Sequence, residues 1–178
     1  MPLQPEQVEQ RARRVRLLLL DVDGVLTDGQ VLIGGSGKEY KGFSIRDGAA
    51  IVWAQRAGLE VALLSGRKSE ATTRRAVELG IQTVIQHGAE KQGPFQTLLA
   101  ERELGAEEVA YMGYDLLDLP VLRRAGLSAA PADAASEVLS NVDWVSRHPG
   151  GRGAVRELIE LLLRARQAWD PLLARFQD

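Results

Sequence analysis

The chain alternates between short apolar runs and longer stretches in which apolar residues recur every three or four positions. The runs end in small or polar residues, as buried strands of a parallel sheet do: RLLLLDVDG, LEVALLSG, IQTVIQHG, VAYMGYD, LSAAPA and VDWVSR. Between most of them lie helix-like segments: DGAAIVWAQRAG, SEATTRRAVELG, KQGPFQTLLAERELG and DLPVLRRAG. The alternation predicts an α/β fold, a Rossmann-like doubly wound parallel sheet with helices on both faces.

Glycines mark the ends of several predicted helices. Gly58, Gly80, Gly105 and Gly126 each precede a strand-like or loop segment, where a left-handed C-terminal cap is common. The last segment, about 153–178, has the pattern of an amphipathic helix and tail that breaks near Pro171. With this length, we expect residues 1–178 to form a single domain.

An insertion at about 29–46 interrupts the alternation. Two extended arms, 31–33 and 40–45, flank a glycine-rich turn and predict a small β-hairpin flap. Because an isolated hairpin is only marginally stable in water, we expect it to pack either as a lid over the site or against another subunit. A hairpin without function is the remaining alternative, although loops beside active sites commonly carry function.

Composition narrows the classes of partner. The 22 Lys and Arg residues nearly balance 24 Asp and Glu residues, so broad attraction to nucleic acid or anionic membranes is not expected. The absence of cysteine excludes disulfides and thiolate metal sites. The polar start and the short apolar run after it suit neither a signal peptide nor a membrane span. We expect a cytoplasmic protein with no nucleic-acid or membrane partner.

Asp21 and Asp23 follow the first predicted strand in the motif DVDG. Two carboxylates held this close repel each other unless a cation neutralises them, and oxygen ligands of this kind suit Mg²⁺. Asp21 can then attack phosphorus and form an aspartyl-phosphate, while Asp23 exchanges protons with the leaving oxygen and with water. The alternative is a turn with two solvated aspartates, since D-x-D-G also occurs in calcium loops.

Three further strand ends carry polar residues. Ser65 in SGR offers a hydroxyl and backbone N–H groups to an anion, or belongs to an ordinary loop before a helix. Lys91 suits a phosphate oxygen, although most surface lysines have no such role. Asp115 and Asp118 either complete a metal shell or cap a helix that begins near Leu116. Taken together, the strand ends predict a metal-assisted phosphoryl-transfer site.

These motifs resemble those of the haloacid dehalogenase superfamily and, more narrowly, of the 3-deoxy-D-manno-octulosonate 8-phosphate phosphatases. The resemblance covers about residues 15–170 and rests on LLLLDVDGVLTDG, FSIRDG, SGRKSE, LGI, DLPVL and GGRGAVRE. It implies a Mg²⁺-dependent phosphatase of lipopolysaccharide sugar biosynthesis, without a large cap domain, acting on a sugar-acid phosphate. It also implies a homotetramer in which the hairpins form a central barrel and the C-terminal tail approaches a neighbour's active site.

The resemblance assigns roles by position. Asp21 becomes the nucleophile and a metal ligand, Asp23 the acid/base and a backbone metal ligand, and Ser65 and Lys91 hold the phosphoryl group. Arg46 and Arg67 suit a substrate carboxylate, which a guanidinium grips with two hydrogen bonds; surface ion pairs are the alternative. The residues matching segments that contact the sugar acid are Ser44, Ile45, Arg46, Asp47, Gly48, Arg67 and Arg75.

One position departs from the family pattern. The fourth motif of the family reads G-D-D-x-x-D, and its first aspartate is a ligand to magnesium, whereas this chain has GYDLLD. Tyr114 occupies the ligand position, and a neutral phenol is a poor ligand for Mg²⁺. Asp115 takes over as a metal ligand only if the backbone adjusts, because consecutive residues leaving a strand point to opposite sides. In the family, the counterpart of Asp118 supports the site from behind the ligands.

Three hypotheses remain at this point. The first is a sugar-acid phosphate phosphatase with a rearranged metal site. The second, motivated by Tyr114, is a weakened or inactive relative that binds a sugar phosphate or serves as a structural subunit of an oligomer. The third is a phospho-acceptor signalling domain, which also clusters acids and a lysine at strand ends. The hairpin and the acid/base aspartate disfavour the third hypothesis.

Overall fold

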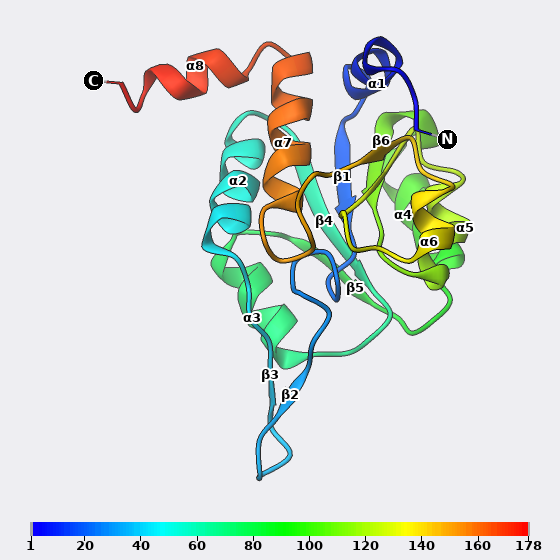
Figure 1. The fold of residues 1–178 in the computed structure, drawn as a ribbon, viewed down its shortest axis with the longest axis vertical. Coiled ribbons are helices and arrows are strands. Elements are labelled where there is room, and N and C mark those ends of the chain that lie inside the picture. Colours follow the sequence, from blue (N-terminus) through cyan, green and yellow to red (C-terminus); the bar gives the residue numbers. More distant parts are fainter. Residues whose placement is uncertain (1, 178) are drawn as a thin grey trace.

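A computed structural model describes residues 2–177 and contains one six-stranded sheet with the order β5-β4-β1-β6-β7-β8 (Figure 1). All five strand pairs are parallel. The predicted doubly wound α/β fold is therefore confirmed. The strands are β1 (Leu17–Leu20), β4 (Glu60–Ser65), β5 (Thr83–Gln86), β6 (Val109–Met112), β7 (Leu127–Ala130) and β8 (Trp144–Val145).

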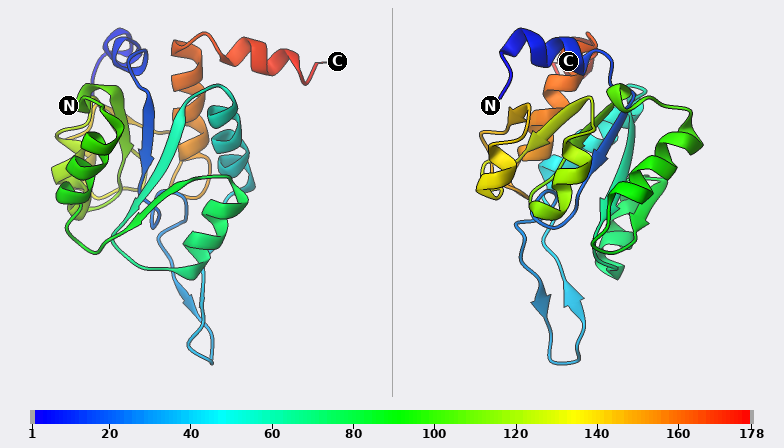
Figure 2. Two further views of the ribbon diagram at one scale, coloured as in Figure 1. Left: turned by 180° about the vertical axis from the view of Figure 1, so that it is seen from behind. Right: turned by 90° about the vertical axis from the view of Figure 1, so that its right-hand side faces the viewer.

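Helices cover both faces of this sheet (Figures 1 and 2). The α-helices are α1 (Pro5–Ala12), α2 (Ile45–Arg56), α3 (Glu70–Glu78), α4 (Gln92–Arg102), α5 (Leu119–Leu122), α6 (Ser136–Leu139), α7 (Ala154–Ala165) and α8 (Trp169–Ala174). Two short 3₁₀ helices, η1 (Ala106–Glu108) and η2 (Leu116–Asp118), lie before and after β6. Within residues 2–177, no helix combines the length and apolar character needed to cross a membrane.

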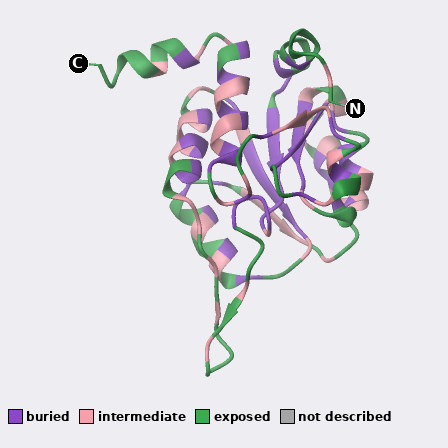
Figure 3. Ribbon diagram, in the orientation of Figure 1, coloured by how far each residue is buried: buried purple, intermediate pink, exposed green. Residues whose placement is uncertain are grey.

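The four leucines of β1 are buried because the strand lies in the middle of the sheet with a helical layer on each side (Figure 3). Leu18 and Leu20 belong to the core cluster that includes residues of α1, α2, α3 and α7. Leu17 and Leu19 belong to the opposite cluster, with residues of α4, α5 and α6. Because successive side chains of a strand point to opposite faces, one run of four leucines contributes to both cores.

The order in which strands are added to the sheet reverses at β1, because β4 and β5 lie on one side of it and β6, β7 and β8 on the other. This reversal defines where a ligand would bind. β1 pairs with β4 on one side and with β6 on the other, with Leu20 level with Leu63 and Met112. In open parallel sheets, the crevice at the carboxyl ends of such neighbouring strands is the usual ligand site. Asp21 therefore emerges at the centre of this edge.

The hairpin consists of β2 (Leu32–Ile33) and β3 (Glu39–Tyr40), an antiparallel pair with shorter arms than the sequence pattern predicts. Its tip extends away from the sheet and helices (Figure 2). Leu32 and Ile33 are 62% and 75% exposed. The tip therefore does not act as a closed lid in this structure, and only the root of the hairpin approaches the strand ends.

Two of the four predicted glycine caps are confirmed: Gly58 and Gly80 have the left-handed backbone that a C-terminal cap requires. At α4 the prediction is wrong, because Glu103, with φ 51°, takes the left-handed position two residues before Gly105. At Gly126 the constraint is space, since a Cβ there would lie 2.4 Å from the carbonyl oxygen of Glu107. A close approach of two backbones, not a cap, requires this glycine.

The C-terminal break also differs from the prediction. The chain leaves α7 through Gln167, whose φ is 59°, and α8 begins at Trp169. Pro171 lies in the first turn of α8, where proline needs no hydrogen-bond partner for its nitrogen. The left-handed residue, not the proline, separates the two helices.

Candidate active site

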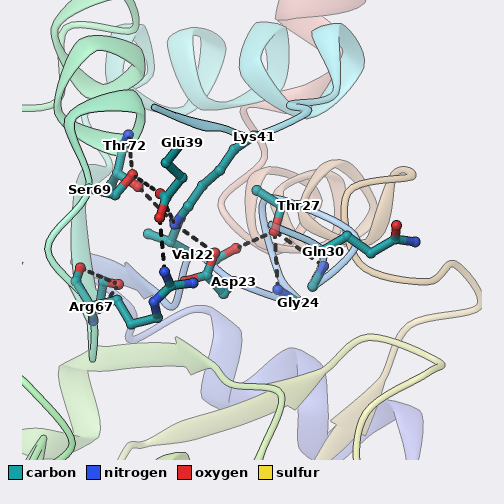
Figure 4. Close-up of polar contacts among 12 residues, drawn as sticks. Val22, Asp23, Gly24, Thr27, Gln30, Glu39, Lys41, Arg67, Ser69 and Thr72 are labelled. Carbon is teal, nitrogen blue, oxygen red and sulfur yellow. Dashed lines mark hydrogen bonds and ion pairs between the residues drawn. The ribbon is translucent and has the colours of Figure 1, made fainter. Parts of the chain in front are cut away.

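The turn after β1 is held in shape by side-chain and backbone contacts. The N–H of Val22 donates to Oδ1 of Asp21 (2.7 Å), and the N–H groups of Gly24 and Gly29 both donate to Oγ1 of Thr27 (3.3 Å each; Figure 4). Gly24 has a φ of 79°, which a side chain would strain. Thr27, whose hydroxyl closes the turn that carries both aspartates, was not predicted from the sequence.

The GGRG stretch packs directly on this turn. The N–H of Gly151 donates to the carbonyl oxygen of Val25 (2.9 Å). A Cβ at Gly150 would fall 1.9 Å from the carbonyl oxygen of Gly24, so the two backbones meet where no side chain fits. The chain before α7 therefore supports the turn of Asp21 and Asp23 from behind.

Lys91 joins three of the predicted strand ends. Its buried ammonium lies 2.9 Å from Oδ1 of Asp21 and 2.6 Å from Oδ1 of Asp118. Tyr111 of β6 donates its hydroxyl to the same Asp118 oxygen at 2.5 Å. The sequence pattern did not single out Tyr111, although a buried tyrosine normally needs a partner for its hydroxyl. The structure thus brings Asp21, Lys91 and Asp118 together.

Asp118 also shapes the loop after β6. Its Oδ2 accepts the N–H groups of Tyr114 (2.7 Å) and Asp115 (3.0 Å). With the contacts to Lys91 and Tyr111, both of its carboxylate oxygens are engaged. Asp118 therefore holds Lys91 and the loop in place and does not face a ligand freely.

The protonation of this cluster follows from burial and charge. Desolvation, assisted by the charge of Asp118, raises the pKa of Asp21 from 3.8 to about 7 despite its contact with Lys91. Burial opposes ionisation of Lys91 too, but the charges of Asp21 and Asp118 raise its pKa above the ordinary value. Burial and the same carboxylates raise the pKa of Tyr111, so the phenol stays protonated. One ammonium thus neutralises two buried carboxyl groups only in part.

Asp23 occupies a different environment from Asp21. Its Oδ1 lies 2.7 Å from Nζ of Lys41, and its Oδ2 lies 4.0 Å from the guanidinium of Arg67. Its side chain remains 23% exposed, so it faces the open side of the strand ends. Lys41 was not predicted, because a lysine at the end of a hairpin arm gives no sequence signal that separates it from a surface lysine.

Ser65 ends β4, two residues past the position level with Leu20. Its hydroxyl accepts the N–H of Arg67 (3.3 Å) and lies 3.2 Å from the carbonyl oxygen of the same residue. This tight turn places Gly66 beside the loop before α4, where a Cβ would lie 3.4 Å from the oxygen of Gly88. Ser65 therefore lies at the same edge as the lysine and aspartates.

The segment 44–48 divides into exposed and buried residues. Ile45 and Arg46 are exposed. Asp47 is buried and accepts the N–H groups of Gly153 (3.1 Å) and Arg156 (2.8 Å), so it fastens α2 to the start of α7. Ser44 caps α2 by accepting the N–H of Asp47. The carboxylate of Asp47 is thus already committed to the fold.

Arg75 lies across the start of α2. Its guanidinium donates to the carbonyl oxygen of Ser44 (3.3 Å) and pairs with Glu78 (2.8 Å). A Cβ at Gly48 would fall 2.2 Å from one of its terminal nitrogens, so glycine is required beneath it. Arg67 differs, since its side chain is half exposed and pairs with Glu39 at 2.9 Å.

The metal ligands expected from the resemblance fit this site only in part. Asp21 offers a buried, incompletely neutralised carboxylate, which suits a hard cation. The ring of Tyr114 instead packs on Gly24, where a Cβ would lie 2.3 Å from its Cγ. Asp115 is exposed and accepts the N–H of Leu116 at 2.7 Å, as a cap of η2. Across residues 2–177, no three acidic, histidine or cysteine side chains gather into a metal site.

The doubly wound sheet, the aspartate pair after its central strand, and the serine, lysine and aspartate at neighbouring strand ends define a hydrolase of the haloacid dehalogenase superfamily. A solved structure described as a hydrolase of this superfamily, from Legionella pneumophila, matches with a TM-score of 0.93 at 34% identity, covering 97% of this chain and 94% of that one. No family model matches the chain.

Closer relatives specify the family. The 3-deoxy-D-manno-octulosonate 8-phosphate phosphatase KdsC of Escherichia coli K12 is 44% identical over 160 residues, 90% of this chain and 85% of the relative. The structure of this phosphatase from Moraxella catarrhalis, in complex with magnesium, phosphate and KDO, matches with a TM-score of 0.94 at 34% identity, covering 96% and 98% of the two chains. The chain belongs to the 3-deoxy-D-manno-octulosonate 8-phosphate phosphatase family.

The raised pKa of Asp21 predicts a cost of ionisation in the metal-free protein. Because the folded state binds this proton more tightly than the unfolded state, stability falls as the pH rises from about 4 to about 7. In chelator at pH 8, Asp21→Asn should be more stable than the unmodified protein by on the order of 2–4 kcal/mol in urea unfolding. The difference should shrink toward pH 5.

The exposed Asp170→Asn serves as the matched control, since it removes an aspartate from α8 far from the cluster. A pH-independent difference between Asp21→Asn and the unmodified protein would contradict the assignment of this titration to Asp21.

Proposed function

We propose that the protein hydrolyses 3-deoxy-D-manno-octulosonate 8-phosphate to the free sugar acid and phosphate, in the supply of this sugar for lipopolysaccharide. The observation that carries the proposal is the buried ammonium of Lys91 shared by Asp21 and Asp118 at the carboxyl edge of the sheet. Family membership supports the substrate, because the KdsC relatives and the KDO complex carry this sugar in their names. The cytoplasmic location stays a prediction.

Two displacements at phosphorus account for the reaction. An oxygen of Asp21 attacks in line, the bond from phosphorus to the sugar oxygen breaks, and Asp23 gives that oxygen its proton. Water then attacks the aspartyl-phosphate, Asp23 takes a proton from it, and the bond between phosphorus and Asp21 breaks. Lys91 and Ser65 hold the phosphoryl oxygens throughout. The nucleophile and acid/base are regenerated.

A divalent cation belongs to the proposed site, with Mg²⁺ as the expected ion. The carboxylate of Asp21 and the backbone carbonyl of Asp23 would hold it, and Asp115 stays a candidate third ligand only if its loop rearranges. When bound, the ion supplies positive charge to the carboxylates and the phosphoryl oxygens. Asp118 supports the site through Lys91 and the loop after β6.

The sugar acid would lie over the exposed residues at the same edge. Arg46 and Arg67 are exposed guanidinium groups suited to its carboxylate, and the exposed Ile45 precedes Arg46 as the first residue of α2. The buried contacts of Asp47, Gly48 and Arg75 favour a supporting role, in which they fix the segment that begins at Ser44. These substrate roles are proposals.

We expect a homotetramer in which the hairpins of neighbouring subunits cover one another. The exposed apolar residues of the hairpin, Leu32 and Ile33, support this expectation, because apolar side chains on a projecting hairpin are costly in water. A non-catalytic subunit is the alternative that Tyr114 motivates. The retained arrangement of Asp21, Lys91 and Asp118 favours the enzyme.

Turnover tests the function. Phosphate release from 3-deoxy-D-manno-octulosonate 8-phosphate with Mg²⁺ should be saturable in the unmodified protein and fall by on the order of 10⁴-fold or more in Asp21→Asn, which lacks the nucleophile. The exposed Asp170→Asn on α8, far from the cluster, is the matched control. Equal activity of Asp21→Asn and the unmodified protein would exclude the proposed nucleophile; no activity in either would favour the non-catalytic subunit.

Tyr114 predicts weakened metal binding. Tyr114→Asp restores a carboxylate at the ligand position of the family motif and should raise the affinity for Mg²⁺, measured by calorimetry, by on the order of 10- to 100-fold. Tyr114→Phe, which keeps the ring on Gly24, should leave the affinity unchanged. If both variants bind the ion equally, the metal does not reach this position.

The oligomer has its own test. Replacing Leu32 and Ile33 together by aspartate should lower the mass found by light scattering, because the charges cannot be buried between hairpins. Val77→Asp changes an equally exposed apolar residue on α3 and should leave the mass unchanged. A monomeric unmodified protein would refute the tetramer directly.

A further inference from the structure

Lys41 is a buried cation that the reaction described above does not use. It follows β3 at the root of the hairpin, and its side chain is 0% exposed. The ammonium lies 2.7 Å from Oδ1 of Asp23 and 3.5 Å from the hydroxyl of Thr72 (Figure 4). Burying a lysine is unfavourable unless a partner compensates it, so this placement needs a reason beyond packing.

The hairpin root fixes Lys41 from the other side. Glu39, two residues earlier, accepts the hydroxyl of Ser69 (2.6 Å) and pairs with Arg67 (2.9 Å). Hydrogen bonding to Ser69 lowers the pKa of Glu39, so its carboxylate stays charged. Because side chains two apart on an extended segment point the same way, Glu39 and Lys41 both face the strand ends (Figure 4). Glu39 therefore anchors the segment that carries Lys41 to the start of α3.

Asp23 needs such a partner. The backbone of its turn is held through Thr27, but its carboxylate is partly exposed and its Oδ1 receives no hydrogen bond from the turn. The other nearby cation, Arg67, is half exposed and stands 4.0 Å from Oδ2. Lys41 is the close, buried contact that can fix the direction of the carboxylate.

We propose that Lys41 is a positioning residue: it holds the carboxylate of Asp23 in the orientation from which protons reach the leaving oxygen and the attacking water. Lys41 itself neither gives nor takes a proton in either step. The kinetic part of this inference rests on the proposed phosphatase function. It also makes the hairpin root part of the active site, independently of what the hairpin tip contacts.

A double-mutant cycle tests the inference on the full-length protein. Lys41→Met should lower kcat for 3-deoxy-D-manno-octulosonate 8-phosphate by roughly 10- to 100-fold with little change in KM, because only the orientation of Asp23 is lost. Added to Asp23→Asn, the same change should lower the residual rate no further. Lys41→Arg, which keeps the charge, should recover part of the rate, and Lys38→Met on the exposed hairpin should have no effect.

Two kinetic results would overturn the inference. One is a loss that multiplies in full with that of Asp23→Asn, since Lys41 would then act separately from Asp23. The other is a loss confined to KM, which would make Lys41 a substrate contact.

Thermal unfolding tests the coupling between Lys41 and Asp23 without requiring turnover. It therefore applies even if the unmodified protein is inactive and the proposed function fails. Asp23→Asn removes the nearer of the two carboxylates around the buried ammonium of Lys41, the other being that of Glu39 at 3.7 Å, so it should lower Tm, and adding Lys41→Met should recover part of that loss. Tm shifts of the two substitutions that simply add would show that the residues are not coupled and would overturn the inference.

Discussion

The contact on which the site depends is the ammonium of Lys91 between the carboxylates of Asp21 and Asp118. It draws the start of α4 to the ends of β1 and β6, three segments far apart in sequence. One positive charge does not neutralise two buried carboxylates, so Asp21 keeps a raised pKa. Removing Lys91 would leave two buried carboxyl groups without a counter-charge, which is among the costly changes in a protein interior, whereas Asp21→Asn would leave Lys91 paired with Asp118. The incomplete neutralisation that costs the folded protein stability therefore lies at the carboxyl group proposed as the nucleophile.

The two aspartates of the first motif are separated by environment. Asp21 is buried and faces Lys91, whereas Asp23 is partly exposed and faces Lys41 on the hairpin root. The same short turn thus presents one carboxyl group to a dry interior and another to the open side. The division requires the chain to turn at Val22 and Asp23, because side chains two apart on an extended strand would point the same way. Lys91 and Lys41 come from distant segments, and each holds one of the two aspartates in its own environment.

The sequence predicted the sheet, its helices and the strand ends because periodicity and position are local signals. It did not predict that Glu103 and Gln167 adopt left-handed backbones, since tertiary packing overrides the usual preference for glycine. It identified Asp21, Lys91 and Asp118 as residues of one edge, but not the partners Tyr111 and Lys41. Those two are ordinary residues in sequence, and only the three-dimensional contacts distinguish them. A sequence motif likewise could not predict that the ring of Tyr114 packs on Gly24.

The backbone contact between Gly150 and Gly24 has a consequence for synthesis on the ribosome. The strand that carries Asp21 is made early, yet its neighbours β4 and β6 come about forty and ninety residues later, and the glycine loop later still. Until that loop has left the exit tunnel, the turn lacks its support and the leucines of β1 lack their cover. Such long-range pairing slows folding and leaves apolar segments open to association. The nascent chain is therefore most open to association before its last third emerges.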